Sequence, residues 1–278
     1  KHSNRFMYLG DYSHLMSRVI TPAEYNMMKE INISLVKVPQ VTIGFWVIKI
    51  LATTMGETGG DAVTMSMSLG YALGTVIFMS IFIAAVMMQT KALKFSPFIY
   101  WFAIIASTTG GTTLADFADR SLGVGYLGGA ALLATLLIIT LIIWYRTLGN
   151  IEVASVDNPK AESFYWLTIM FSQTLGTALG DWTADSAGLG YIGASYIFSL
   201  GLCAVLALYL FSQISRTLLF WVAFVLTRPL GAVVGDFLDK PVAQGGLELS
   251  RYSATAVLLF VIVILVMFLP QRPAKKLH

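Results

Sequence analysis

One pattern occurs four times along the chain and constrains its architecture more than any other feature. A tryptophan is followed ten residues later by a glycine, and five residues after that glycine comes an aspartate preceded by a small residue. Another glycine follows nine residues after each aspartate. Tryptophan is rare, so agreement at this many fixed offsets indicates internal repetition rather than chance. The tryptophans are Trp46, Trp101, Trp166 and Trp221, and the aspartates are Asp61, Asp116, Asp181 and Asp236.

The composition predicts that these repeats lie in a membrane. Hydrophobic residues make up 56% of the 278 residues and charged residues only 12%, which is outside the usual range for soluble domains. The net charge of +3 is small and scattered, so we expect no nucleic-acid partner. The single cysteine, Cys203, excludes an intrachain disulfide. We therefore expect an integral membrane protein surrounded mainly by lipid.

Eight apolar runs approach the roughly 20 residues that a helix needs to cross the hydrocarbon layer. The odd-numbered runs carry the repeated pattern, whereas the even-numbered runs are almost entirely apolar. Each repeat thus holds two spans, so all four repeats begin on the same side of the membrane and are parallel. We predict an all-α polytopic membrane protein, built either as four hairpins around one axis or as two pairs related by a pseudo-twofold. The eight predicted transmembrane helices are residues 40–61, 71–90, 96–116, 126–146, 161–181, 191–212, 216–236 and 249–269.

The segments outside the spans are polar. Within an N-terminal arm, residues 1–39, the sequence Thr21-Pro22-Ala23-Glu24 is typical of a helix start, and predicts a short helix at about residues 22–31. The arm lacks the long apolar stretch of a secretory signal; we expect it to contact a protein partner or the membrane surface, or to be a solvated arm. The missing first methionine suggests a fragment or a processed product. The remaining divisions are repeats 1 and 2 at 40–149, a linker at 150–160, repeats 3 and 4 at 161–270, and a basic tail at 271–278.

The loop charges predict an orientation. Lysine and arginine are concentrated in the connections between repeats and near the termini, whereas the loops within repeats hold only Arg120, Lys240 and Arg251. The positive-inside rule therefore predicts that both termini are cytoplasmic. Each aspartate lies fifteen residues beyond its tryptophan, about 22 Å along a helix at 1.5 Å per residue. We expect the aspartates at the external side of the membrane.

A polar stripe follows one face of each motif helix. Positions four, eight and twelve residues before the aspartate share its helix face. A charge at the centre of a membrane helix costs about 2.5–3.5 kcal/mol, so such a stripe is expected to face a protein interior or a watery cavity. This arrangement predicts a pathway. In repeat order the stripe reads Glu57, Thr53 and Lys49; Thr112, Thr108 and Ile104; Thr177, Gln173 and Ile169; Ala232, Arg228 and Phe224.

Carboxylates gather at the external end of this stripe. Close carboxylates cannot all ionise cheaply, so we expect some of them to bind a cation or the coupling proton of transport; the four repeat aspartates are also a candidate divalent-metal site. Capping of neighbouring helices is their alternative role. The expected ion ligands are Asp61, Asp116, Asp181, Asp236, Glu57, Thr53, Thr112 and Thr177, with Arg228 and Lys49 as charge partners.

The first glycine of each motif has two interpretations. With a small residue four positions later, it forms a ridge that lets helix backbones approach closely. It could also let the helix break and turn backbone carbonyls toward an ion. The four glycines are Gly56, Gly111, Gly176 and Gly231.

From about Val41 to Leu269 the chain resembles a family of bacterial membrane proteins described only as a tandem fourfold repeat of unknown function. Each repeat of that family has two transmembrane segments and a characteristic tryptophan, which the four motif tryptophans match. The resemblance implies a protein of the bacterial inner membrane. It implies no activity.

Three functional classes therefore compete. Carboxylates, threonine hydroxyls and backbone carbonyls are oxygen ligands that suit a small hard cation, which favours a transporter, either an exporter or a proton-coupled carrier. The histidines His2, His14 and His278 lie outside the spans, which argues against a soft-metal site. The alternative is a non-transporting subunit of a larger membrane assembly that docks through residues 1–39. An intramembrane enzyme is disfavoured because the sequence has no Ser-His, Cys-His or HExxH arrangement, and we expect no cofactor beyond a bound divalent cation.

Overall fold

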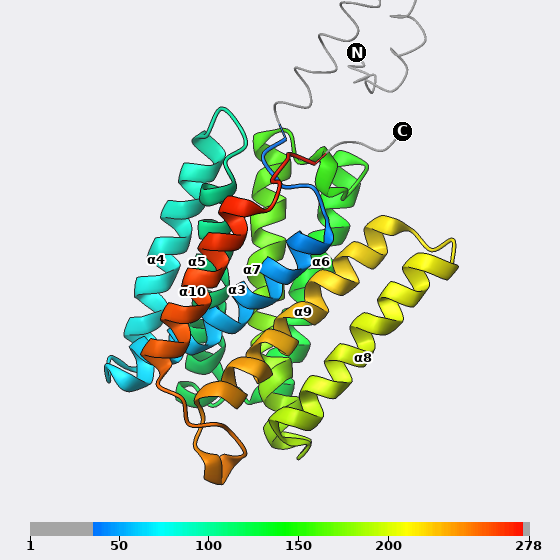
Figure 1. Cartoon of the computed structure of the whole chain (residues 1–278). Helices are drawn as coiled ribbons and strands as arrows, with labels where there is room; N and C mark the ends of the chain where they lie inside the picture. The colour runs from blue at the N-terminus through cyan, green and yellow to red at the C-terminus, as the bar shows by residue number, and fades with distance from the viewer. Residues whose placement is uncertain (1–35, 275–278) are drawn as a thin grey trace, which may run out of the picture.

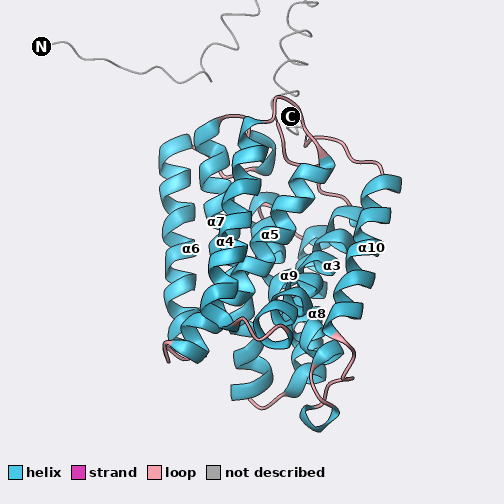
Figure 2. Ribbon diagram, turned by 90° about the vertical axis from the view of Figure 1, so that its left-hand side faces the viewer, coloured by secondary structure: helices cyan, strands magenta, loops and turns pink. Residues whose placement is uncertain are grey.

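The computed structural model describes residues 36–274. All eight apolar runs form α-helices, and the described residues contain no strand (Figures 1 and 2). The helix predicted at residues 22–31 and the last residues of the basic tail lie outside the described residues. The helices are α3 (Ile43–Asp61), α4 (Gly70–Lys91), α5 (Pro97–Asp116), α6 (Tyr126–Leu148), α7 (Pro159–Asp181), α8 (Gly190–Phe211), α9 (Arg216–Asp239) and α10 (Arg251–Phe268).

Local sequence explains where these helices begin. The side chains of Thr42, Asn158 and Ser215 cap α3, α7 and α9 by accepting a hydrogen bond from a backbone N–H of the first turn. We call the four helices that carry the motif, α3, α5, α7 and α9, the inner helices, and the other four the outer helices. The last glycine of each motif lies at the turn that follows its inner helix, and all four have a positive φ, which a residue with a Cβ adopts only at a cost. These glycines are Gly70, Gly125, Gly190 and Gly245.

The four motif helices form a closed ring. Helix α3 packs against α5 and α9, and α7 packs against the same two helices from the opposite side. Each outer helix packs on the inner helix of the following repeat: α4 on α5, α6 on α7, α8 on α9, and α10 on α3. Figure 1 shows all four inner helices beginning at the end of the molecule where the described chain starts and ends. The last outer helix therefore closes the ring against the first inner helix.

The ring has an apolar exterior. Six helices, α4, α5, α6, α8, α9 and α10, are long and apolar enough to cross a membrane. The prediction of eight spans is thus supported by length and composition for six of them. The other two, α3 and α7, are more polar inner helices, because their buried faces carry groups such as Lys49, Glu57 and Gln173.

The first motif glycines lie at the contacts between neighbouring inner helices. A Cβ added at any of the four would come closer than 3.0 Å to a side chain of the next inner helix in the ring, which real structures essentially never show. The helices run unbroken through these positions. The glycines thus act as a close-packing ridge. The pairs are Gly56 with Thr108, Gly111 with Gln173, Gly176 with Arg228, and Gly231 with Thr53.

Aromatic side chains fill one end of the ring. The residue before each motif tryptophan is phenylalanine or tyrosine, and its ring contacts the tryptophan of the next repeat, so that the contacts run around the whole ring. We call these eight residues the aromatic girdle. Two tyrosines within it are joined by a hydrogen bond of 2.6 Å between the hydroxyls of Tyr100 and Tyr165. The centroid distances are 5.4 Å for Phe45–Trp101, 5.8 Å for Tyr100–Trp166, 6.1 Å for Tyr165–Trp221 and 5.7 Å for Phe220–Trp46.

The two ends of the described chain meet beside the girdle. The backbone N–H of Gln40 donates to the carbonyl of Arg272 at 2.8 Å, and that of Ala274 donates to the carbonyl of Val38 at 2.8 Å. Lys37, the residue before Val38, forms a buried ion pair of 2.6 Å with Glu162 of α7. The described chain therefore begins and ends on the same side of the ring.

Candidate ion-binding site

The motif aspartates lie at the end of the ring opposite the girdle, and all four are buried. Three of them are the last residues of α3, α5 and α7, and the fourth lies in the last turn of α9. After each of the first three, the backbone widens into one π-helical turn. Such turns are frequent at functional sites. The π-helical turns are Ala62–Ser66, Phe117–Ser121 and Trp182–Ser186.

Lys240 joins the aspartates of repeats 1 and 4. Its ammonium group forms ion pairs with Asp61, with Asp236 at 2.9 Å and, more distantly, with Asp239 at 3.9 Å. Arg251, at the start of α10, adds a 2.7 Å contact to Asp239 and a 3.9 Å contact to Asp61. Burial lowers the pKa of Lys240, but the charges of Asp236, Asp61 and Asp239 outweigh it and hold that pKa well above the ordinary value of 10.5. The three carboxylates therefore favour the charged form of Lys240.

Arg120 joins the aspartates of repeats 2 and 3. Its Nε atom lies 2.8 Å from Asp116, and its Nη2 atom lies 3.7 Å from Asp181. The Arg120 side chain is 31% exposed, whereas both aspartates are almost fully buried. The four motif aspartates are thus held in two pairs by cations from the loops.

We call this layer the acidic level. Its ion pairs connect five aspartates to three cations, so two carboxylate charges have no cation of their own. Four buried Oδ1 atoms of this layer have no hydrogen-bond partner within residues 36–274, those of Asp61, Asp116, Asp236 and Asp239. Among these four, only Oδ1 of Asp61 also takes part in none of the ion pairs. The members of the acidic level are Asp61, Asp116, Asp181, Asp236, Asp239, Arg120, Lys240 and Arg251.

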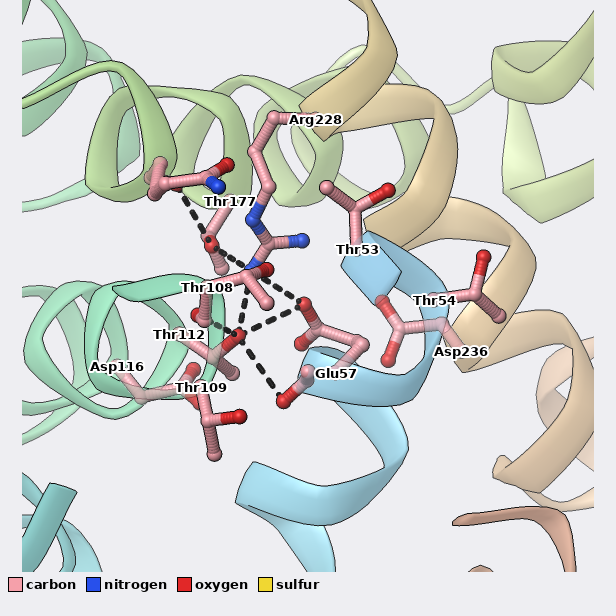
Figure 3. A network of polar contacts seen from close by, with 12 residues as sticks. Thr53, Thr54, Glu57, Thr108, Thr109, Thr112, Asp116, Thr177, Arg228 and Asp236 are labelled. Carbon is pink, nitrogen blue, oxygen red and sulfur yellow. Dashed lines mark hydrogen bonds and ion pairs between the residues drawn. The ribbon is translucent and has the colours of Figure 1, made fainter. Parts of the chain in front are cut away.

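One helical turn deeper, Arg228 joins all four repeats. Its Nη2 atom donates to Oε2 of Glu57 at 3.0 Å, to the hydroxyl of Thr177 at 2.6 Å and to the hydroxyl of Thr112. Thr112 in turn donates to Glu57 at 3.2 Å. Figure 3 shows the guanidinium group reaching between these three side chains. They occupy the same position in repeats 1, 2 and 3, and the fourth repeat has the small Ala232 there.

A second polar layer lies between Glu57 and the aromatic girdle, and we call it the basic level. All of its side chains are fully buried. Lys49 places its ammonium group 4.0 Å from the centre of the Phe224 ring and 3.5 Å from the hydroxyl of Thr227. Within the described part of the chain, no carboxylate forms an ion pair with Lys49. The basic level consists of Lys49, Thr53, Thr108, Gln173 and Arg228.

The repeat seen in sequence and structure also defines the family. Four stretches match the model of one family, described as Repeat of Unknown Function (DUF347), and together they cover most of the chain. The chain belongs to this family. No curated protein and no solved structure matches the chain. The matched stretches are residues 44–94, 99–150, 164–215 and 219–270.

Each stretch of this family repeat contains one inner helix and the outer helix that follows it. The two helices of one stretch are not principal packing partners, because each outer helix packs on the inner helix of the next stretch. A single repeat therefore leaves the packing face of its inner helix uncovered. The family repeat is a unit of sequence, and the ring is the unit of folding.

The structure brings together most of the residues predicted as ion ligands. Glu57, Asp61 and Asp116 form a buried group whose ligand oxygens lie within 4.8 Å of one another, and Asp61, Asp236 and Asp239 form another. Lys240 already contacts all three members of the second group. Carboxylate oxygens at this spacing suit a hard cation, and the first group is the better candidate for it.

Three predicted ligands lie away from the aspartates. The hydroxyl of Thr53 bonds to the backbone carbonyls of Ile50 at 2.8 Å and Thr227 at 3.2 Å, in the basic level. The hydroxyls of Thr112 and Thr177 face Arg228. Thr112 and Thr177 therefore lie around Arg228 rather than among the aspartates.

The site residues predicted from the sequence do not include Arg120, Lys240 or Arg251, although all three were recognised as cations of the loops within repeats. Arg120 and Lys240 each lie four residues after a motif aspartate, a spacing that allows an ion pair on a helix and was available as a signal. Arg251 is far in sequence from Asp61, and only the packing of α10 on α3 brings the two together. No local pattern predicts that contact.

Proposed function

We propose that the chain is an integral protein of the bacterial inner membrane, crosses it eight times and has both termini on the cytoplasmic side. The apolar exterior of the ring supports insertion, and the polar helices α3 and α7 are shielded from lipid by their neighbours. The excess of lysine and arginine in the connections between repeats supports the orientation. The acidic level then lies toward the outside and the aromatic girdle toward the cytoplasm.

We propose that the protein is a carrier of a small hard cation, working as an exporter or in exchange for protons. The observation that carries this proposal is the charge of the acidic level: five buried aspartates against three cations. Uncompensated carboxylates inside a membrane protein are costly, and such groups commonly mark ion or proton pathways. A bound cation would remove that cost.

The chemistry of the donor set fits a hard cation. Glu57, Asp61 and Asp116 offer three buried carboxylate oxygens within 4.8 Å of one another. Mg²⁺, Ca²⁺ and Mn²⁺ prefer such oxygen ligands. The one cysteine, Cys203, is exposed on an outer helix and takes no part in the group.

Glu57 and Arg228 form the connection between the acidic level and the interior. In this conformation Arg228 occupies the axis below the acidic level and neutralises Glu57. A cation that reaches Glu57 competes with Arg228 for the same carboxylate. Passage toward the girdle therefore requires a second conformation in which Arg228 moves, as alternating access demands.

Flux measurements on reconstituted protein test the proposal. Proteoliposomes would be supplied in turn with Mn²⁺, Mg²⁺, Ca²⁺ and Na⁺, and internal pH would be recorded alongside uptake. We expect saturable flux of at least one cation, which Asp61→Asn abolishes. The matched control is Asp185→Asn, an exposed aspartate of repeat 3 outside the acidic level, and it should transport like the wild type. Absence of flux for every ion from folded wild-type protein would overturn the proposal.

A further inference from the structure

A buried lysine without a counter-ion calls for a ligand that the cation carrier does not provide. Lys49 is fully buried on α3, and within residues 36–274 the polar contacts of its ammonium group are those with the Phe224 ring and the hydroxyl of Thr227. Asp61 lies twelve residues further along the same helix, about 18 Å at 1.5 Å per residue. The carboxylates of the acidic level are therefore too distant to pair with it. A buried charge in this position is costly unless a partner neutralises it.

Arg228 has unused hydrogen-bond donors in the same region. Its Nη2 atom makes all of its contacts to Glu57, Thr112 and Thr177, whereas its Nε and Nη1 atoms are buried and have no partner within residues 36–274. Buried polar groups in proteins nearly always have a partner, so each exception needs an explanation. These two nitrogens lie on opposite edges of the guanidinium group, so each offers a separate charged donor to a ligand.

Lys49 and Arg228 lie in the same region of the ring. The ammonium group of Lys49 reaches Thr227, the residue immediately before Arg228. Helices α3 and α9 are in close contact here, since Thr53 donates to the carbonyl of Thr227 at 3.2 Å and packs on Gly231. From α5, the hydroxyl of Thr108 is buried at the same level and also has no partner in the described chain. Donors from three helices thus gather around the basic level.

The basic level carries surplus positive charge, whereas the acidic level carries surplus negative charge. Glu57 neutralises Arg228 through their 3.0 Å ion pair, and nothing in the described residues neutralises Lys49. One positive charge therefore remains, which one monovalent anion would balance. The helices pack closely here, since a Cβ added at Gly231 or Gly176 would clash with Thr53 or Arg228, so only a small ligand is considered.

We propose that Lys49 and Arg228 bind a small monovalent anion of the chloride class in the basic level, with the hydroxyl of Thr108 as a further donor. The site lies deeper than the cation site, meets it only at the Glu57–Arg228 pair, and does not depend on transport. It holds the anion between the Glu57–Arg228 pair and the aromatic girdle. Its role is to neutralise Lys49 inside the ring.

Direct binding of chloride tests this site. Protein purified in a chloride-free gluconate buffer would be titrated with ³⁶Cl⁻, and bound label would be measured at equilibrium. We expect saturable binding at about one chloride per chain, weakened at least tenfold in Lys49→Ile. Isoleucine is the residue at the equivalent position in repeats 2 and 3, Ile104 and Ile169, so this variant should fold. The control is Lys94→Ile, an exposed loop lysine, which should bind like the wild type.

Thermal unfolding gives a second measurement on the same proteins. Chloride should raise the Tm of the wild type and of Lys94→Ile relative to gluconate, and should leave the Tm of Lys49→Ile unchanged. If Lys49→Ile does not fold, Lys49→Met, which keeps an unbranched side chain, takes its place. Either the absence of saturable chloride binding to folded wild type, or equal binding by the Lys49 variants, would overturn the proposal.

Discussion

The acidic level and the basic level use the fourfold repeat in opposite ways. At the acidic level all four repeats supply the same residue, an aspartate, and surrounding cations pair with it. At the basic level the equivalent positions carry three kinds of side chain, in Thr53, Thr108, Gln173 and Arg228, and only one repeat supplies a lysine. The repeated residues thus build a symmetric layer with surplus negative charge. The unrepeated residues build an asymmetric layer with surplus positive charge.

Residues that recur in every repeat build the ring, whereas residues found in one repeat only indicate a specific function. The motif glycines and the aromatic girdle keep the same contacts in every repeat, so they explain why four copies close into a ring. Glu57, Lys49 and Arg228 each occur in one repeat only. Where duplicated repeats lose their symmetry in the buried interior, packing alone gives no reason for the change. Those positions are where a specific ligand or path is to be expected.

The largest loss of stability is expected when the Glu57 carboxylate, which connects the acidic level to Arg228, is removed. Glu57→Leu removes the one carboxylate that pairs with Arg228 within residues 36–274, and it leaves a fully buried guanidinium unpaired. Breaking a buried pair from one side costs about 3–5 kcal/mol, and we expect the upper end here. The free energy of unfolding in mixed micelles measures the loss.

The matched control is the double variant with Glu57→Leu and Arg228→Leu. Removing both charges leaves no unpaired ion, so it should recover most of the lost stability. A double variant as unstable as Glu57→Leu alone would show that the pair contributes through packing rather than charge.

Replacing the lysine should lower the stability of the protein at the acidic level but not at the basic level. Lys240→Met removes a cation shared by Asp61 and Asp236, and we expect a loss of about 3 kcal/mol, less than at Glu57 because Arg251 still contacts Asp61. Lys49→Met removes a charge that has no carboxylate partner, so in chloride-free buffer its stability should equal or exceed that of the wild type. Thermal unfolding of both variants in gluconate makes the comparison, and equal losses at the two lysines would contradict the opposite charge of the levels.

A smaller loss is expected where the ring is packed most closely. Gly176→Ala places a methyl group against the Arg228 side chain and 3.0 Å from Cδ of Pro229, and such overpacking costs about 1–3 kcal/mol. In Gly128→Ala, on the outer helix α6, the nearest atom lies 3.9 Å from the added methyl group. That control should be neutral or slightly stabilising, since alanine favours helix over glycine. Equal unfolding free energies for the two variants would refute the packing role of the motif glycines.

The smallest effect is expected in the aromatic girdle, which has no ionised groups. Tyr100→Phe removes one hydroxyl of the 2.6 Å hydrogen bond to Tyr165, and should cost about 0.5–1.5 kcal/mol. Replacing both tyrosines by phenylalanine leaves no unpaired hydroxyl, so the double variant should not be less stable than the single one. A loss as large as that of Glu57→Leu would show that the girdle, rather than the charged levels, dominates the stability of the ring.

Much of the fold could be predicted from the sequence because it depends on local pattern. The eight apolar runs coincide with the eight helices to within a few residues, since apolar composition, proline and capping residues act over one or two turns. The family match confirms the four tandem repeats. The span from Trp46 to Asp61 likewise places the aromatic and the acidic residues at opposite ends of α3.

The rest depends on contacts between distant segments. Nothing in a single repeat shows that α4 packs on α5 rather than on α3, or that α10 closes the ring and brings Arg251 to Asp61. The stripe of Lys49, Thr53 and Glu57 was visible in the sequence. The contacts of Arg228 with Thr112 and Thr177 were not visible, because they depend on how closely the inner helices approach one another and on the relative height of these helices in the ring.

Binding of Mn²⁺ to the acidic level tests the cation site most directly, measured by equilibrium dialysis with ⁵⁴Mn²⁺ in wild type, Asp61→Asn and the exposed control Asp185→Asn. We expect saturable binding to wild type and to the control, and an affinity at least tenfold lower in Asp61→Asn, because Asp61 belongs to the buried group with Glu57 and Asp116. Equal affinity in all three proteins, or no saturable binding to folded wild type, would contradict the proposed cation site.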